Sequence, residues 1–240
     1  MMKKFISFVL FAFIVTQVSA QSNRVTDNID IEIKGRALNS IQEFNIKNIN
    51  GDVKVSGYDG DEIQISGSKT IRTKGRNLNR DILKKIYLRQ EEHEGVMYVF
   101  VEAPGVEVKF KKGGMNYSIN SQQNRRNGYE DLQYEFNIEV KMPQNMALSS
   151  STINGKKVIV ENMFNGVDAS NVNGDVFLKE IIGTTRAHTV NGDIEAYFTE
   201  SPDTEAEFKT VNGSIEVYSP KDLGAVVTFR SLHGELYTDF

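Results

Sequence analysis

The sequence predicts an all-β protein built as a right-handed parallel β-solenoid, a fold in which successive turns of the chain stack on one another. The first observation is an Asn-Gly step that recurs through the C-terminal half, with His-Gly as a variant, at intervals of 19, 18, 21 and 21 residues. The second is a constant apolar frame around each step. The third is that residues 148–240 show no helical period. The glycines of the repeat are Gly155, Gly174, Gly192, Gly213 and Gly234.

The apolar frame predicts two short strands in each repeat. Apolar residues lie two positions before each glycine and, in the later repeats, two positions after it. Side chains on a strand alternate between its faces, so these positions are expected to point inward together, with a bend between the strands. The residues before the glycines are Ile153, Val172, Val190, Val211 and Leu232, and those after them are Val176, Ile194, Ile215 and Leu236.

An antiparallel meander or sandwich remains open as the alternative fold. Asn-Gly is the strongest short signal for a β-hairpin, because both residues tolerate the positive φ of a type I′ turn. Each Asn-Gly step would then join two neighbouring strands of one sheet.

The N-terminus predicts export. Lys3 and Lys4 precede an apolar run from Phe5 to Val15, and small residues before Gln21 suit a signal-peptidase site after residue 20. The run is shorter than the ~20 apolar residues that a membrane span needs, so a transmembrane anchor is the weaker reading. Residues 1–20 are therefore expected to be a signal peptide and residues 21–240 a single domain that does not span the membrane after cleavage.

The remaining elements follow from period-2 patterns. Residues 27–70 read as β-structure, and residues 86–102 read as a hairpin with a turn around Gly95. The polar, glycine-rich stretch 105–131 is expected to be an exposed loop insertion. A strand over 134–140 leads into the repeats.

Composition excludes several classes of function. The chain has 28 basic and 32 acidic residues, and removal of the two lysines of the signal peptide would change its formal net charge from −4 to −6. This mild acidity disfavours nucleic acid as a partner. The absence of cysteine excludes disulfides, thiolate metal sites and a cysteine nucleophile.

The motifs resemble those of the bacterial putative-adhesin domain family, exported domains of unknown function thought to form a β-solenoid. The resemblance rests on the segments 48–63, 140–143, 189–194 and 210–215, including the serial Val-Asn-Gly steps, and it extends over nearly the whole mature chain apart from residues 105–131. It implies a non-catalytic protein of the bacterial cell envelope, located in the periplasm, on the outer surface or outside the cell. It carries no active-site residues to this sequence.

The asparagines and glycines of the repeat are expected to be structural. Asparagine side chains stacked in a column can bond to one another, as in cross-β stacks, and both residue types suit tight turns. These turn and ladder residues are Asn50, Gly51, Asn154, Gly155, Asn173, Gly174, Asn191, Gly192, Asn212, Gly213 and Gly234.

Two acidic residues motivate an enzymatic alternative. Asp175 and Asp193 follow the glycines of adjacent repeats, and stacking would bring their carboxylates to about 5 Å, close enough to bind Ca²⁺. Some β-helical polysaccharide-degrading enzymes use acids in this way. The column is interrupted by Ser214, and we find no Ser-His-Asp grouping or phosphate-binding loop. We therefore predict no catalytic residue, no metal site and no cofactor, with the calcium-dependent lyase or hydrolase left as the alternative.

An outward face of acids and aromatic residues is the candidate binding surface. Its residues are Asp175, Asp193, Glu195, Glu216, Phe177 and Tyr237. Such a face suits an envelope polysaccharide or protein partner, so the leading hypothesis is an adhesin-like scaffold or binding module. The last repeat has no polar cap, which predicts either self-association through the C-terminal repeat or further sequence beyond Phe240.

Overall fold

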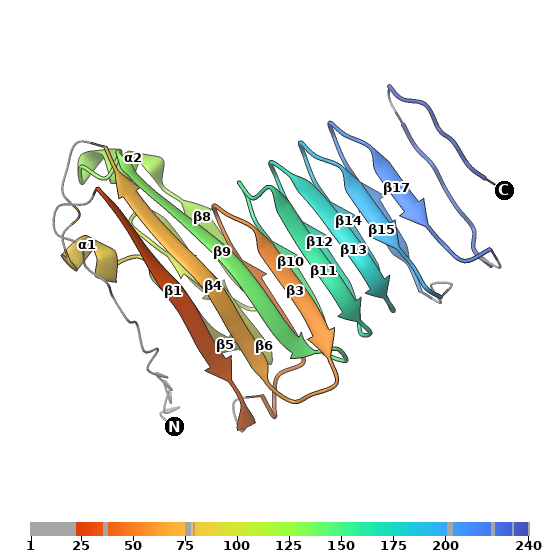
Figure 1. Cartoon of the computed structure of the whole chain (residues 1–240), viewed down its shortest axis with the longest axis horizontal. Helices are drawn as coiled ribbons and strands as arrows, with labels where there is room; N and C mark the ends of the chain where they lie inside the picture. Colours follow the sequence, from red (N-terminus) through yellow and green to blue (C-terminus); the bar gives the residue numbers. More distant parts are fainter. Residues whose placement is uncertain are drawn as a thin grey trace.

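The computed structural model describes residues 23–35, 38–74, 78, 80–200, 204–221, 224–231 and 233–239. The expected signal peptide lies outside the described residues. Two sheets face each other and form an elongated molecule, with β1 near one end and β17 near the other (Figure 1). No helix among the described residues is long and apolar enough to cross a bilayer.

The larger sheet has eight strands as described. In spatial order they are β1 (Arg24–Ile33), β4 (Ile63–Thr73), β9 (Leu132–Pro143), β3 (Val53–Tyr58), β11 (Lys157–Met163), β13 (Asp175–Ile181), β15 (Ile194–Tyr197) and β17 (Ile215–Tyr218). The seven-stranded sheet runs β16 (Ala206–Lys209), β14 (Thr185–His188), β12 (Val167–Ser170), β10 (Ala147–Ser151), β2 (Glu43–Lys47), β6 (Val96–Glu102) and β5 (Tyr87–His93).

Both sheets are mixed, so the predicted right-handed parallel β-solenoid is wrong. Strand β4 pairs antiparallel with both β1 and β9, and β5 pairs antiparallel with β6. The long β4 and β9 share ten consecutive paired positions, from Gln64 opposite Lys141 to Thr73 opposite Leu132. The backbone N–H and C=O groups of these long strands bond to a strand that is far away in the sequence. A repeat pattern between neighbouring segments does not reveal such a pairing.

The Asn-Gly steps join the two sheets. In each repeat the strand before the step belongs to the seven-stranded sheet and the strand after it to the eight-stranded sheet, as with β10 and β11 around Asn154-Gly155. Corresponding strands of successive repeats then pair in parallel, for example β11 with β13 and β13 with β15. The steps are therefore crossings between sheets and not the hairpin turns of a meander.

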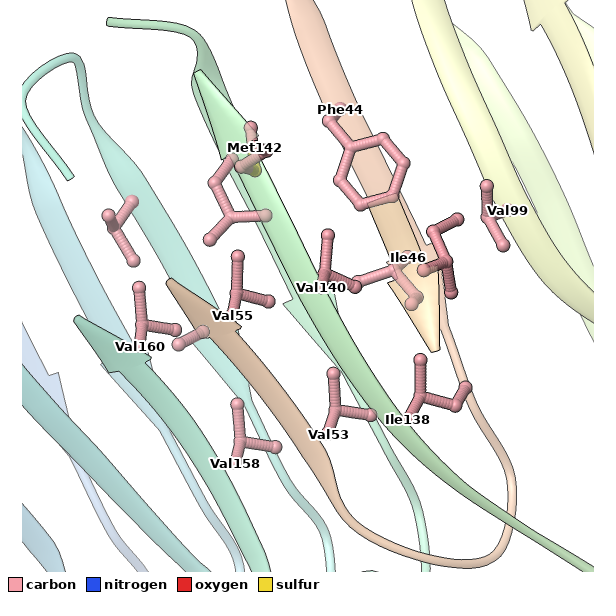
Figure 2. Close-up of a cluster of buried hydrophobic side chains, with 14 of the residues drawn as sticks. Phe44, Ile46, Val53, Val55, Val99, Ile138, Val140, Met142, Val158 and Val160 are labelled. Carbon is pink, nitrogen blue, oxygen red and sulfur yellow. The ribbon is translucent and has the colours of Figure 1, made fainter. Parts of the chain in front are cut away.

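The core lies between the two sheets and comes from the alternating apolar positions of both. Figure 2 shows Phe44 and Ile46 of β2 facing Val53 and Val55 of β3, with Ile138 of β9 beside them. All five side chains are buried. Val176 and Ile194, two positions after Gly174 and Gly192, continue this core in agreement with the period-2 pattern, whereas Ile215 and Leu236 at the same position of the last two repeats are exposed.

The valines before the glycines do not face the core as expected. Val172, Val190 and Val211 are 37%, 39% and 72% exposed. They lie at the crossing between sheets, where the chain leaves one strand before entering the next, so strand alternation does not apply to them. In the first three repeats the residue one position earlier is buried instead, namely Thr152, Asn171 and Thr189.

The asparagines at the crossings form a continuous column of amides. The Nδ2 group of each donates to the Oδ1 atom of the one in the preceding repeat. The distances are 2.9 Å from Asn154 to Asn50, 2.8 Å from Asn173 to Asn154, 2.9 Å from Asn191 to Asn173 and 2.8 Å from Asn212 to Asn191. Each repeat is thus bonded to its neighbour by side chains as well as by backbone.

Residues 105–131 are not a structureless loop, contrary to the sequence-based expectation. They contain the hairpin β7 (Val106–Lys111) and β8 (Gly114–Ile119), followed by the short helix α2 (Ser121–Arg126). The hairpin packs on the seven-stranded sheet, because the Tyr117 hydroxyl donates to the Val101 carbonyl at 2.7 Å and the Phe110 ring contacts Tyr98. A second short helix, α1, spans Arg80–Lys84.

Candidate binding surface

The acidic residues after the repeat glycines hold neighbouring repeats together. One carboxylate oxygen of Asp175 accepts the backbone N–H of Asp193 at 3.1 Å, and Asp193 in turn accepts that of Ser214 at 2.7 Å. Asp52 accepts the backbone N–H of Lys156 at 2.6 Å. The aspartate after the glycine therefore has the same structural role in each of these repeats, which is to accept a backbone N–H group of the next repeat.

Asp175 and Asp193 do not form a larger acidic cluster. No group of three or more His, Cys, Asp or Glu side chains that could hold a metal ion occurs in the part of the chain that the structure describes. The second carboxylate oxygen of Asp175 lies 4.0 Å from the Lys157 ammonium. The two carboxylates of the calcium-dependent alternative are thus engaged with backbone amides and a neighbouring lysine.

Glu195, Glu216 and Phe177 lie in one row on the outer face of the eight-stranded sheet. Phe177 of β13 is in register with Glu195 of β15, which is in register with Glu216 of β17. Two residues further along β15 and β17, Tyr197 is in register with Tyr218 and faces the same side. We call Phe177, Glu195, Tyr197, Glu216 and Tyr218 the aromatic–acid face.

Each tyrosine of this face is bonded to the glutamate two residues before it. The Tyr197 hydroxyl donates to Glu195, and the Tyr218 hydroxyl donates to Glu216 at 2.7 Å. The hydrogen bond to its carboxylate raises the pKa of Tyr197 to about 12, because the bond favours the protonated phenol and the negative charge opposes its ionisation. The pKa of Tyr218 is raised for the same reason.

The aromatic rings form a short stack along the sheet. The Tyr197 and Tyr218 rings lie 4.4 Å apart and 3° from parallel, and the Phe177 ring lies 5.7 Å from Tyr197 at 49°. Tyr197 therefore stacks on Tyr218 and has a tilted aromatic neighbour in Phe177. Tyr218 has a stacked neighbour on one side and stands on the last strand of the sheet, with 46% of its surface exposed.

Tyr197 and Tyr218 were missed by the sequence analysis, although a signal for them exists. The pattern Glu-x-Tyr occurs at 195–197, 216–218 and 235–237. Side chains two residues apart on a strand share a face, so this pattern places a phenol beside a carboxylate in each case. Tyr237, which was expected on the face, instead lies in the segment after β17 and is 81% exposed.

A cleft on the seven-stranded sheet lies between the strands β2 and β6 and the β7–β8 hairpin. It is a polar cleft of about 360 Å³. Its lining residues include Glu43, Asn45, Lys47, Glu94 and Tyr98. Burial and the nearby carboxylates of Glu43 and Glu94 raise the pKa of Tyr98. The cleft is formed by a different sheet from the aromatic–acid face, so the two surfaces are separate.

Comparisons with known proteins give matches only at the level of solved structures. No family model matches the sequence, and no curated protein matches it. A putative cell adhesion protein from Clostridium sporogenes is 12% identical, with a TM-score of 0.40 and coverage of 80% of this chain and 100% of that chain. A putative adhesin from Parabacteroides merdae is 10% identical, with a TM-score of 0.20 and coverage of 86% and 100%. A putative lipid binding protein from Parabacteroides distasonis is 12% identical, with a TM-score of 0.24 and coverage of 81% and 97%.

Proposed function

We propose that this chain is an exported, non-enzymatic binding protein of the bacterial cell envelope, and that it binds a glycan on the aromatic–acid face. The observation that carries the proposal is the side-by-side arrangement of two Glu–Tyr pairs on β15 and β17, next to Phe177. The signal peptide expected from the sequence supports export.

The chemistry of the face favours a neutral polyhydroxylated ligand. An ionised carboxylate only accepts hydrogen bonds, and the tyrosine hydroxyl in each pair already donates to it, so Glu195 and Glu216 offer their remaining lone pairs to donors on a ligand. Sugar hydroxyls are such donors, and the apolar C–H face of a sugar ring suits the exposed side of Tyr218. The two like charges on adjacent strands disfavour an anionic polysaccharide.

The strands also fix the spacing of the two acceptors. Strands in a sheet lie about 4.8 Å apart, so Glu195 and Glu216 present equivalent acceptors at that interval on a rigid surface. A rigid surface loses little conformational entropy on binding. An extended chain of sugars can therefore contact both carboxylates without rearrangement of the protein.

The test is a calorimetric binding assay with cello-, manno- and N-acetylglucosamine oligomers and with polygalacturonate as the anionic probe. We expect at least one neutral oligomer to bind, and the double substitution Glu195→Gln/Glu216→Gln to weaken that binding by about tenfold or more. Glu139→Gln is the matched control, because Glu139 is exposed on β9 of the same sheet, away from the aromatic rings. It should leave binding unchanged.

Two outcomes contradict the proposal. Absence of binding to every neutral oligomer contradicts the glycan as the ligand. Equal losses of affinity in the double variant and in Glu139→Gln contradict the aromatic–acid face as the binding site. No observation favours the lyase or hydrolase alternative, since Asp175 and Asp193 serve the contacts between repeats.

A further inference from the structure

The end of the molecule at β16 and β17 leaves apolar side chains uncovered. These strands are the last in their sheets as described. Ile215 and Val217 of β17 are 42% and 47% exposed, whereas Ile194 and Ala196, the residues in register on β15, are fully buried. The unpaired edge also presents backbone N–H and C=O groups that a further strand can bond. This end therefore has the features of a strand-docking site.

The segment after β17 carries the apolar pattern of one more repeat. Val227, Phe229 and Leu236 each follow Ala206, Phe208 and Ile215 by the same 21 residues, and Gly234 follows Gly213 by the same interval. The connection has a matching length, because eight residues separate Tyr218 from Val227 and eight separate Tyr197 from Ala206.

The described residues of this segment form no strand and lie at the far end of the molecule from β1 (Figure 1). Its apolar side chains are exposed, with values of 44% for Val227, 50% for Phe229 and 58% for Leu236. The chain thus holds an uncovered apolar edge and, directly after it, a segment whose apolar positions fit that edge.

We propose that residues 225–231 and 233–238 dock on the open end of their own molecule and form its last pair of strands. Val227 and Phe229 lie beside Ala206 and Phe208 of β16, which extends the seven-stranded sheet. Leu236 lies beside Ile215 of β17. The occupant is the chain's own segment, because the short connection after β17 keeps the segment at a high local concentration near the open end. This connection is also as long as the one between β15 and β16.

Docking also changes the aromatic–acid face, a consequence that rests on the proposed function. In the same 21-residue register Tyr237 falls beside Glu216 on the outer side of the sheet, since Tyr237 and Leu236 alternate along a strand. Glu235 and Tyr237, whose side chains are already bonded to each other, would extend the face by one strand. The docked segment would then take part in ligand binding.

Hydrogen exchange of the mature chain, read by mass spectrometry without any glycan, tests the docking by itself. We expect backbone amides of β17 and of residues 227–230 to exchange at least about tenfold more slowly than in the variant Phe229→Asp. Val226→Asp is the matched control. Val226 is 98% exposed and points away from the core in the proposed register, so its substitution should preserve the protection.

Two other results overturn the docking proposal. Equal protection in the wild type, Phe229→Asp and Val226→Asp shows that the segment does not dock. Protection that falls on dilution, together with a dimer in light scattering, assigns the end to the segment of a second copy instead of its own. Loss of glycan binding with the protection intact contradicts the proposed function alone and leaves the docking supported.

Discussion

Gly192 lies at a close approach of two neighbouring repeats, and a side chain has no room there. A Cβ atom built on Gly192 would lie 2.2 Å from the carbonyl oxygen of Gly174, and the same approach recurs one repeat later between Gly213 and Gly192. We expect Gly192→Ala to destabilise the protein by about 2 kcal/mol or more, because the backbone atoms of two neighbouring crossings must separate. Chemical denaturation measures the change. Gly224→Ala is the control, since a Cβ atom at Gly224 would meet no other atom within 4 Å, and an equal effect of both substitutions would contradict the argument.

Tyr197 should ionise at unusually high pH. Its pKa of about 12 lies above the value of about 10 for an unfolded chain, so its hydrogen bond to Glu195 stabilises the fold fully below about pH 10 and is lost as the pH rises through about 12. Glu195→Gln removes the negative charge, and we expect this substitution to lower the pKa of Tyr197 toward 10. Rapid pH-jump absorbance at the phenolate band records the shift, with Glu139→Gln as the control. Identical titration curves for the wild type and Glu195→Gln would show that this contact is absent.

At the scale of secondary-structure elements, a buried ion pair fixes the register between β1 and β4. Asp27 and Lys69 are directly opposite each other, with 3.1 Å between the carboxylate and the ammonium, and their side chains are only 7% and 9% exposed. Asp27→Leu leaves the lysine charge buried without its partner, so we expect a loss of about 3–5 kcal/mol in the free energy of unfolding.

The double substitution Asp27→Leu/Lys69→Met should recover most of that loss, because two apolar side chains replace both charges. A double-mutant cycle in guanidinium chloride measures the coupling. The exposed pair between Lys34 and Glu32 on the same part of the chain supplies the control, and Glu32→Gln should produce no measurable change. A double variant no more stable than Asp27→Leu would refute the role of the pair.

The same elements show how far the sequence predicts the fold. The hairpin of β5 and β6 was predicted correctly, because its strands are adjacent and its turn contains Gly95. The antiparallel pairing of β4 with β9 was not, since these strands are separated by the whole of β5 to β8 and no local pattern links them. The β7–β8 hairpin was also missed, because its few apolar residues, Phe110 and Tyr117 among them, are partly buried by contact with another sheet and show no clear periodicity of their own.

The candidate site divides in the same way. Strand alternation placed Phe177, Glu195 and Glu216 on one outer face, and the tyrosines two residues beyond the glutamates follow from the same rule. That Tyr237 lies outside the face could not be inferred from the sequence. The repeat spacing predicts beside which strand a segment would fit, but it does not predict whether the segment pairs with that strand.

At the scale of the whole molecule, stability is expected to depend on the β1 end far more than on the β17 end. The buried core residues run from Ile33 to Phe198, and of the described residues after position 199 only Ala206 and Phe208 pack against that core, both partly exposed. The long strands β4 and β9, which pair over ten positions, lie near the β1 end. The repeats after β13 therefore add to a core that is already largely complete.

Two deletions of a chain that begins at Gln21 should have opposite consequences. A chain ending at Thr199 loses β16, β17 and the segment after them, yet it keeps every side chain of the buried core, so we expect circular dichroism to show a β-rich protein with one cooperative thermal transition at a lower temperature. A chain lacking residues 21–42 loses β1, and Lys69 then has no Asp27 carboxylate beside it. We expect that chain to lose cooperative unfolding or to aggregate, because the unpaired charge and the bare edge of β4 act together. If the chain that ends at Thr199 were unfolded and the chain without β1 were stable, the core would have to lie nearer β17 than the burial of these side chains indicates.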